Sequence, residues 1–231
     1  MSLLGREKIT LDRSQAYIGV LIDDLVTKEN HEPYRMMTSR AEYRLLLRQD
    51  NADLRLSKIG YEAGLVSKEA YDKVVRKQEQ IDKEIERLKT TYVGSSKRVS
   101  DFLNSIGSSE LKSGSSLFEL ISRPELDYYM IGPIDDNRQE LDRDVMEQVN
   151  INIKYAGYID KQIKQVEGFK KLENKKIPKN IDYNKVSGLR NEARQKLISY
   201  SPVSIGQASR ISGVSPADIS VLLVYLKSGN R

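Results

Sequence analysis

The sequence predicts an all-α protein in which two long helices form a helical bundle and three short helices form a C-terminal subdomain. Charged residues make up 31% of the 231 residues and the mean hydropathy is -0.55, values typical of long helices with one solvated face. Apolar residues recur every three or four positions through the two longest segments. Serine followed three positions later by Glu, Gln or Asp marks several helix starts.

The first helix is expected between Asp12 and Lys28, with Asp12 or Ser14 as its cap. Apolar side chains share one face of this segment: Tyr17, Val20, Leu21 and Leu25. Pro33 must end it, because the residue before a proline avoids the helical region.

A second helix is expected from Ser39 to about Arg48. Ser39 and Glu42 have the spacing of a capping box, in which each side chain bonds the backbone amide of the other residue. Turn-forming residues follow at 50–53, and a short helix is predicted from Ser57 to Gly64.

The most regular pattern runs from Ser67 to Tyr92. Its apolar positions alternate three and four apart, with one polar interruption: Tyr71, Val74, Gln78, Ile81, Ile85, Leu88 and Tyr92. This spacing predicts a long helix with the seam of an antiparallel bundle or coiled coil. Loops rich in glycine and serine are expected at 107–109 and 113–116, around short helices.

The turn-rich segment 132–137 is the best candidate for a domain boundary, and it divides the chain into residues 5–137 and 138–231. A second long helix is expected after it. Residues 149–155 alternate like a strand, but a longer row has helical spacing: Val149, Ile153, Ala156, Ile159, Ile163 and Val166. The longer row favours a helix.

The C-terminal part contains clear helix starts. Ser204 and Gln207 form one capping box, and Ser215, with Pro216 at the first helical position and Asp218 at the third, begins another helix. A hydrophobic-Ser-Gly-hydrophobic pattern occurs at 186–189 and again 25 residues later at 211–214. This turn resembles the helix-hairpin-helix element, in which backbone amides face a phosphate. A plain interhelical turn is the other interpretation.

Composition excludes several classes of site. The chain has no cysteine and a single histidine, which rules out disulfides, thiolate sites and sites with two histidines. No two glycines are two or five residues apart, so neither common phosphate-binding glycine loop is present. The longest apolar run has six residues, too short to span a bilayer. We see no catalytic or metal site, because His31 is most simply a solvated loop residue and Asp23 and Asp24 point apart on a helix.

Four arginines form the first candidate binding site. Arg40, Arg44 and Arg48 are four residues apart and would form one row on a helix, with Arg35 just before it. Arginine binds phosphate in a bidentate way, so RNA or a phosphate-bearing cofactor is a suitable ligand. The alternative is a salt-bridged helix that pairs with nearby aspartates, namely Asp23, Asp24, Asp50 or Asp53.

The second candidate is a lysine run. Between Lys161 and Lys179 there are seven lysines and two glutamates, a local charge of +5 that equals the net charge of the chain. These residues either face phosphate or form the solvated end of a helix. The phosphate-facing candidates are Lys170, Lys171, Lys175 and Lys176. Three further residues, Glu192, Arg210 and Gly213, are candidates for docking a nucleic acid or a partner, although Glu192 has the place of a helix-dipole partner.

The blocks 16–27, 32–36 and 38–44 (AYIGVLIDDLVT, EPYRM and TSRAEYR) resemble the GidA family, the FAD-dependent subunits of the tRNA uridine 5-carboxymethylaminomethyl modification enzyme. Further similar blocks extend to the end of the chain: 45–56, 154–159, 206–214 and 216–220. The resemblance covers about residues 5–227 and corresponds to the C-terminal third of the family. The start Met-Ser-Leu, with no apolar signal region after it, suggests that residues 1–4 are an expression scar and linker. The resemblance implies that 5–137 continues from a missing FAD-binding domain.

The resemblance implies a helical appendage of a homodimeric, cytoplasmic flavoenzyme that modifies the tRNA wobble uridine with a GTPase partner. FAD and NADH would be held by the parent enzyme and no cofactor by this fragment alone. Arg35 and Arg44 resemble the family's tRNA-contact arginines, and Glu192 matches a functionally important acidic position. Two alternatives stay open. Residues 17–48 could complete the flavin or folate site, or the chain could be only a bundle that dimerises or docks the GTPase through residues 219–226.

Overall fold

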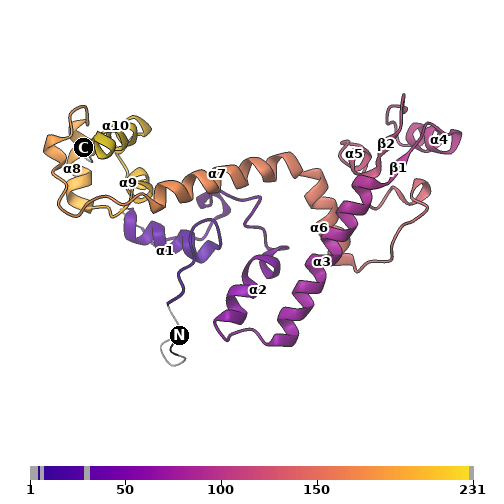
Figure 1. The fold of residues 1–231 in the computed structure, drawn as a ribbon, viewed down its shortest axis with the longest axis horizontal. Helices are drawn as coiled ribbons and strands as arrows, with labels where there is room; N and C mark the ends of the chain where they lie inside the picture. The colour runs from indigo at the N-terminus through magenta and orange to yellow at the C-terminus, as the bar shows by residue number, and fades with distance from the viewer. Residues whose placement is uncertain (1–4, 6–7, 29–31, 229–231) are drawn as a thin grey trace. The chain divides into compact units, whose positions relative to one another are not determined.

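The structure is a computed structural model that describes residues 5, 8–28 and 32–228 (Figure 1). These residues form ten α-helices, and their only paired strands are β1 (Tyr92–Val93) and β2 (Ser115–Ser116), which run antiparallel. The predicted all-α class is therefore confirmed.

The chain forms two compact units. The first contains Arg48–Asp160 and the described residues up to Ile9, and the second contains Thr10–Leu47 and the chain from Lys161 onward. The domain boundary after Asn137 stays a prediction, and it falls within the first unit.

The first unit is built around α3 (Lys68–Thr90), the long helix expected from its apolar seam. Ser67 caps it by accepting a hydrogen bond from the amide of Ala70, and Ile81 and Leu88 are fully buried. The helices and helical turns around it are α2 (Ala52–Glu62), α4 (Lys97–Ser105), α5 (Leu117–Ile121), η3 (Gly132–Ile134) and α6 (Arg143–Lys154). The α3 seam thus supplies one side of a hydrophobic core.

Two boundaries in this unit differ from the sequence prediction. Helix α2 begins at Ala52 rather than Ser57, because Asn51 accepts hydrogen bonds from Arg55 through both its carbonyl and its side chain. The second long helix is present but is divided at Tyr155 into α6 and α7 (Ala156–Asn174). Residues 149–154 are helical, so the longer apolar row was the correct indicator.

The second unit contains α1 (Tyr17–Thr27), most of α7 and the three predicted C-terminal helices. Its remaining elements are η2 (Thr38–Arg40), η4 (Tyr183–Lys185), α8 (Asn191–Tyr200), α9 (Ile205–Arg210) and α10 (Pro216–Ser228). Ser204 accepts from the amide of Gln207 at 3.1 Å, which confirms the predicted start of α9. The predicted caps of α1 are wrong, because its N-cap is Ala16.

The two repeated Ser-Gly turns share one backbone conformation. Gly188 has φ +90° and Gly213 has φ +93°, in the left-handed region that glycine adopts without strain. The glycines are therefore explained by turn geometry. Whether either turn faces a phosphate stays a prediction.

Candidate nucleic-acid interface

Residues 32–47 carry three of the predicted arginines, but they do not form the predicted helix. The 3-10 turn η2 is the only helical element in this described segment, and turns and bends follow it to Leu47. The helix expected from Ser39 to Arg48 is therefore wrong. The single row of Arg40, Arg44 and Arg48 is wrong for the same reason.

Hydrogen bonds to distant residues replace those that a helix needs. The carbonyl of Arg40 accepts from Nη2 of Arg13 at 3.4 Å, where a helix would use an amide four residues later. The amide of Leu45 donates to Oε1 of Gln162 at 3.2 Å, and Nε2 of Gln162 donates to the carbonyl of Glu42 at 3.4 Å. The Glu42 carboxylate, the expected capping-box partner, instead accepts from Arg13 at 2.7 Å.

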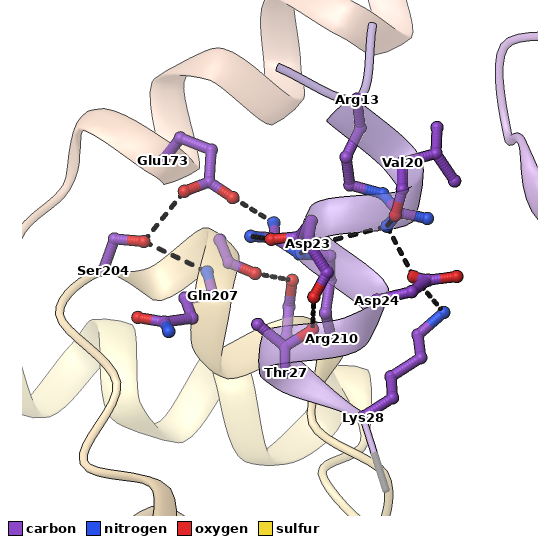
Figure 2. Close-up of polar contacts among 12 residues, drawn as sticks. Arg13, Val20, Asp23, Asp24, Thr27, Lys28, Glu173, Ser204, Gln207 and Arg210 are labelled. Carbon is purple, nitrogen blue, oxygen red and sulfur yellow. Dashed lines mark hydrogen bonds and ion pairs between the residues drawn. The ribbon is translucent and has the colours of Figure 1, made fainter. Parts of the chain in front are cut away.

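Arg13 is a buried cation that joins α1 to this segment, and sequence analysis missed it. Figure 2 shows its side chain beside Asp23 and Asp24 of α1. Its Nη1 donates to the carbonyl of Val20 at 3.2 Å, to Asp23 at 3.1 Å and to Asp24 at 2.6 Å. Burial by itself lowers the pKa of Arg13, but the bonds to Glu42 and Asp24 outweigh burial and raise it above its ordinary value. Arg13 is therefore charged at any pH at which the protein is folded.

Asp24 is fully buried and shares its charge among three partners. The hydroxyl of Tyr34 donates to it at 2.8 Å, and Nζ of Lys28 lies 2.8 Å from its carboxylate. Burial tends to raise the pKa of Asp24, but bonds from Lys28, Tyr34 and Arg13 lower it below the ordinary value. The guanidinium of Arg40 lies 5.1 Å from the centre of the Tyr34 ring. Segment 32–47 is thus tied to α1 at Tyr34 as well as at Glu42.

A second line of polar contacts links α1, α9 and α7 (Figure 2). Nε of Arg210 lies 2.7 Å from Asp23, its Nη1 pairs with Glu173, and Ser204 donates to Glu173 at 2.9 Å. The Arg210 guanidinium also lies 5.0 Å from the centre of the Phe169 ring, and the side chain is only 12% exposed. Arg210, predicted as a docking residue, is therefore engaged inside the unit.

Arg35 and Arg44 have the opposite environment. Both side chains are exposed, and neither makes an ion pair with another described residue. Arg44 lies directly before Leu45, whose amide is fixed by Gln162, and Arg35 directly follows Tyr34. Two exposed side chains thus project from backbone that the buried network holds. Arg40 is also exposed, although its guanidinium rests on Tyr34.

The predicted lysines belong to the same unit. Lys170 and Lys171 are exposed on α7, where Nζ of Lys170 lies 3.8 Å from Asp12. Lys176 is exposed, whereas Lys175 is half-buried. The structure therefore leaves three of these four side chains in solvent.

Arg48 belongs to the first unit and is not part of this surface. Its Nε donates to Asp50 at 3.1 Å and its Nη2 to Gln148 at 3.1 Å. The alternative role of these arginines was to pair with nearby aspartates. This alternative is confirmed for Arg48, which pairs with Asp50.

Glu192 lies beside the turn at Gly213. A Cβ added at Gly213 would come within 2.7 Å of Oε1 of Glu192, and Arg190 lies 3.9 Å from the same carboxylate group. A carboxylate this close opposes a phosphate at the Gly213 amide. Docking through Glu192 or Gly213 stays a prediction, and a basic partner group suits Glu192 better than RNA does.

Asp218 fixes the two Ser-Gly turns to each other. It is 2% exposed, accepts from Arg190 Nη2 at 2.7 Å and from the amide of Ser215 at 2.9 Å. Arg190 also donates to the carbonyl of Gly213 at 2.8 Å. The hydrogen bond from Arg190 holds the pKa of Asp218 far below its ordinary value, against the opposing effect of burial.

We expect Asp218→Asn to destabilise the second unit by about 1–3 kcal/mol at pH 7, because charge-assisted bonds to a buried carboxylate are lost. The folded-state pKa is lowered, so this contribution is complete above the unfolded pKa of about 3.9 and declines as pH falls below it. Urea unfolding at pH 7 and at pH 3 measures both effects. A wild-type advantage that is the same at both pH values would contradict the assignment.

Among the described residues, no group of His, Asp or Glu side chains is placed to hold a metal ion, and no helix is long and apolar enough to cross a membrane. His31 lies outside the described residues. In the proposed docking surface 219–226 of α10, Ile219 and Leu222 are buried in the core, whereas Val224 is 66% exposed. The predicted stripe is therefore covered by the chain itself at those two positions.

Comparisons with known proteins agree on one family. The model of the tRNA modifying enzyme MnmG/GidA C-terminal helical domain matches residues 68–163, and that of its C-terminal helical bundle matches 165–231. The tRNA uridine 5-carboxymethylaminomethyl modification enzyme MnmG of Clostridium kluyveri is 62% identical over 100% of this chain and 37% of its own length. The enzyme of the same name from Caldicellulosiruptor saccharolyticus is 61% identical with the same coverage.

A solved structure agrees with these matches. GidA of Aquifex aeolicus in the form II crystal has a TM-score of 0.76 and 42% identity, and the match covers 97% of this chain and 35% of that one. This chain therefore spans little more than a third of the relatives that it matches. Two C-terminal models and high identity along its whole length show that the chain belongs to the C-terminal domain of the MnmG/GidA family.

Proposed function

We propose that this chain is the tRNA-binding domain of an enzyme of the MnmG type. The observation that carries the proposal is the contrast between two kinds of arginine in the second unit. Arg13 and Arg210 are buried in ion pairs and hold the backbone, whereas Arg35 and Arg44 are exposed without a carboxylate partner among the described residues. Exposed guanidiniums on a fixed backbone suit bidentate contacts to phosphate.

The distribution of charge supports an RNA ligand. The second unit carries 19 Lys and Arg against 11 Asp and Glu, a net charge of +8, and the rest of the chain carries 19 against 22, a net charge of -3. The positive charge is thus concentrated on the unit that contains Arg35, Arg44 and the exposed lysines of α7. Such an imbalance raises the local concentration of a polyanion and speeds its association.

The wider setting follows from the relatives and is part of the proposal. Their name indicates modification of tRNA uridine, and we place this domain in a cytoplasmic flavoenzyme that acts at position 5 of the wobble uridine. FAD and NADH do not fit this chain's own residues, because the described part has only two-residue strands and no glycine-rich turn between a strand and a helix. They would bind elsewhere in the enzyme. A homodimer and a GTPase subunit complete the proposed assembly.

We expect Arg35→Gln and Arg44→Gln each to weaken binding of a tRNA transcript by about 1–2 kcal/mol and to lower the salt slope of log K by about one. Filter binding over a series of salt concentrations measures both quantities. Lys83→Gln is the matched control, since Lys83 is equally exposed but lies in the first unit. Circular dichroism should show no change for any of the three variants.

Equal affinities for wild type and both arginine variants would show that these residues do not contact tRNA. In that case the alternative role of residues 17–48, completion of a cofactor site, would become the better explanation.

A further inference from the structure

A cavity in the C-terminal helical part has no role in the function proposed above. Its volume is about 540 Å³, within the range of small-molecule sites. It lies between the loop 177–184, which follows α7, and residues 198–203 at the end of α8. All of these residues belong to the second unit.

The backbone around the cavity is well fixed. The amide of Ile177 donates to the carbonyl of Val203 at 3.1 Å, and the amide of Ile205 donates to the carbonyl of Lys175 at 2.9 Å. Ser201, which lines the cavity, has φ 46° and is the only non-glycine with positive φ in the described part of the chain. Ser201 is the C-cap of α8, and its amide donates to the carbonyl of Leu197 at 3.0 Å, which ends the helix at the cavity wall. The cavity is thus built into the fold.

The walls combine apolar surface with one buried polar group. Ile198 and Val203 line the cavity although they are 49% and 56% exposed, so they present apolar surface with nothing to cover it. Tyr183 also lines the cavity and is only 5% exposed, yet its hydroxyl makes no hydrogen bond with another described residue. A phenol hydroxyl that makes no hydrogen bond within the described part of the chain can donate to a ligand or accept from one.

The charge around the cavity selects the class of ligand. Residues 175–185 contain four lysines and one aspartate, a net charge of +3 in eleven residues. Lys176, Lys179 and Lys185 are exposed and make no ion pair with another described residue, while the Asp182 carboxylate accepts from the amide of Asn184. A flat apolar ligand that carries negative charge matches these features better than a peptide side chain does.

We propose that this cavity binds one unpaired nucleotide of RNA. The base would lie between Ile198 and Val203, an edge of the base would bond the Tyr183 hydroxyl, and the adjoining phosphates would face the lysines. This inference rests on the proposed tRNA-binding function and adds to it a contact that depends on a base. Unpaired bases in loops and at ends are the usual targets of such pockets.

The test compares two fluorescein-labelled RNA hexamers of equal charge, hexauridylate and an abasic hexamer. We expect wild type to bind hexauridylate at least about fivefold more tightly than the abasic hexamer, as a single base contact would give. Tyr183→Phe and Ile198→Ser should reduce that difference while leaving the affinity for the abasic hexamer unchanged. Val224→Ser is the matched control, since Val224 is 66% exposed on α10 and does not line this cavity.

A tRNA transcript gives a second measurement. Ile198→Ser should lower its affinity several-fold with an unchanged salt slope, whereas Lys179→Gln should lower the slope by about 0.7–0.9. Normal tRNA binding with equal affinity for the two hexamers would overturn the nucleotide pocket alone. Pocket variants that bind hexauridylate like wild type would also overturn the nucleotide pocket alone. This result is expected if the cavity binds a peptide. If wild type bound no RNA at all, the proposed function would fail as well.

Discussion

Arg13→Met should destabilise the second unit by about 3 kcal/mol, the largest effect that we expect from a single ion-pair residue in this chain. The variant leaves Asp24 fully buried with one fewer cation, and it also frees the Arg40 carbonyl and the Glu42 carboxylate. We place the loss at the lower end of the range for broken buried pairs, because Lys28 and Tyr34 still contact Asp24. Since whole domains are stable by only about 5–15 kcal/mol, this is a large fraction.

Hydrogen exchange of the α1 amides measures this loss within the second unit, which matters because two units need not unfold together. Arg98→Met is the control. Arg98 pairs with Asp136 at 2.7 Å, but both side chains are more than half exposed, so its loss should change stability little. Equal protection of α1 in the Arg13 variant and in wild type would contradict the central role of this cation.

The double variant Arg13→Met, Asp24→Asn separates two causes of lost stability. One is the missing attraction between Arg13 and Asp24, and the other is the buried Asp24 carboxylate that is left with one fewer cation. Removing the carboxylate should restore part of the stability, because the buried group then carries no charge. The double variant should still bind tRNA more weakly than wild type, since segment 32–47 has lost its link to α1 at Glu42.

The elements that the sequence predicts correctly are those determined by local signals. The seam of helix α3 runs from Tyr71 to Leu88 with one polar position, and a serine caps the helix. Helix α9 starts at Ser204, which accepts from the amide of Gln207 three residues later, and α10 starts at a capping box of Ser215 and Asp218. Each of these signals lies within one helix and does not depend on the rest of the fold.

Segment 39–48 shows where such reasoning fails. Its capping-box spacing and arginine row are good local signals for a helix, but its backbone groups bond to Arg13 and Gln162, 27 to 120 residues away in sequence. The sequence around Arg13 and around Gln162 gives no signal that these side chains bond the backbone of segment 39–48. Tertiary hydrogen bonds therefore override local propensity, as they often do outside long periodic helices.

The residues of the candidate site also divide into those whose environment agrees with the sequence and those that depend on distant contacts. Exposure of Arg35 and Arg44 agrees with their place in a polar segment, whereas the engagement of Arg210 with Asp23 and Glu173 depends on residues 187 and 37 positions away. The cavity at Tyr183 has no sequence signature, because its walls come from a loop and the end of a separate helix. Charge can be read from the sequence, but the distinction between a structural and a free arginine requires the structure.

Gly19→Ala should destabilise the second unit by about 2 kcal/mol, although Ala favours helices by about 1 kcal/mol over Gly. A Cβ at Gly19 would lie 2.3 Å from the carbonyl oxygen of Asp12 and 2.7 Å from that of Leu11, both backbone atoms. Helix α1 must therefore move away from the turn that carries Arg13. Because the bonds from Arg13 to Asp24 and Glu42 depend on that close approach, tRNA affinity should fall together with stability.

Gly168→Ala is the matched control on α7, where a Cβ would meet nothing within 4 Å. This change should stabilise the helix by about 0.5–1 kcal/mol, so the two substitutions are expected to have opposite signs. Hydrogen exchange of α1 and α7 amides measures both variants, and titration with a tRNA transcript tests the link to binding. If Gly19→Ala stabilised the unit as Gly168→Ala does, α1 would not pack against the 11–13 turn as described. Destabilisation with wild-type tRNA affinity would instead show that the Arg13 network supports the fold without positioning the exposed arginines.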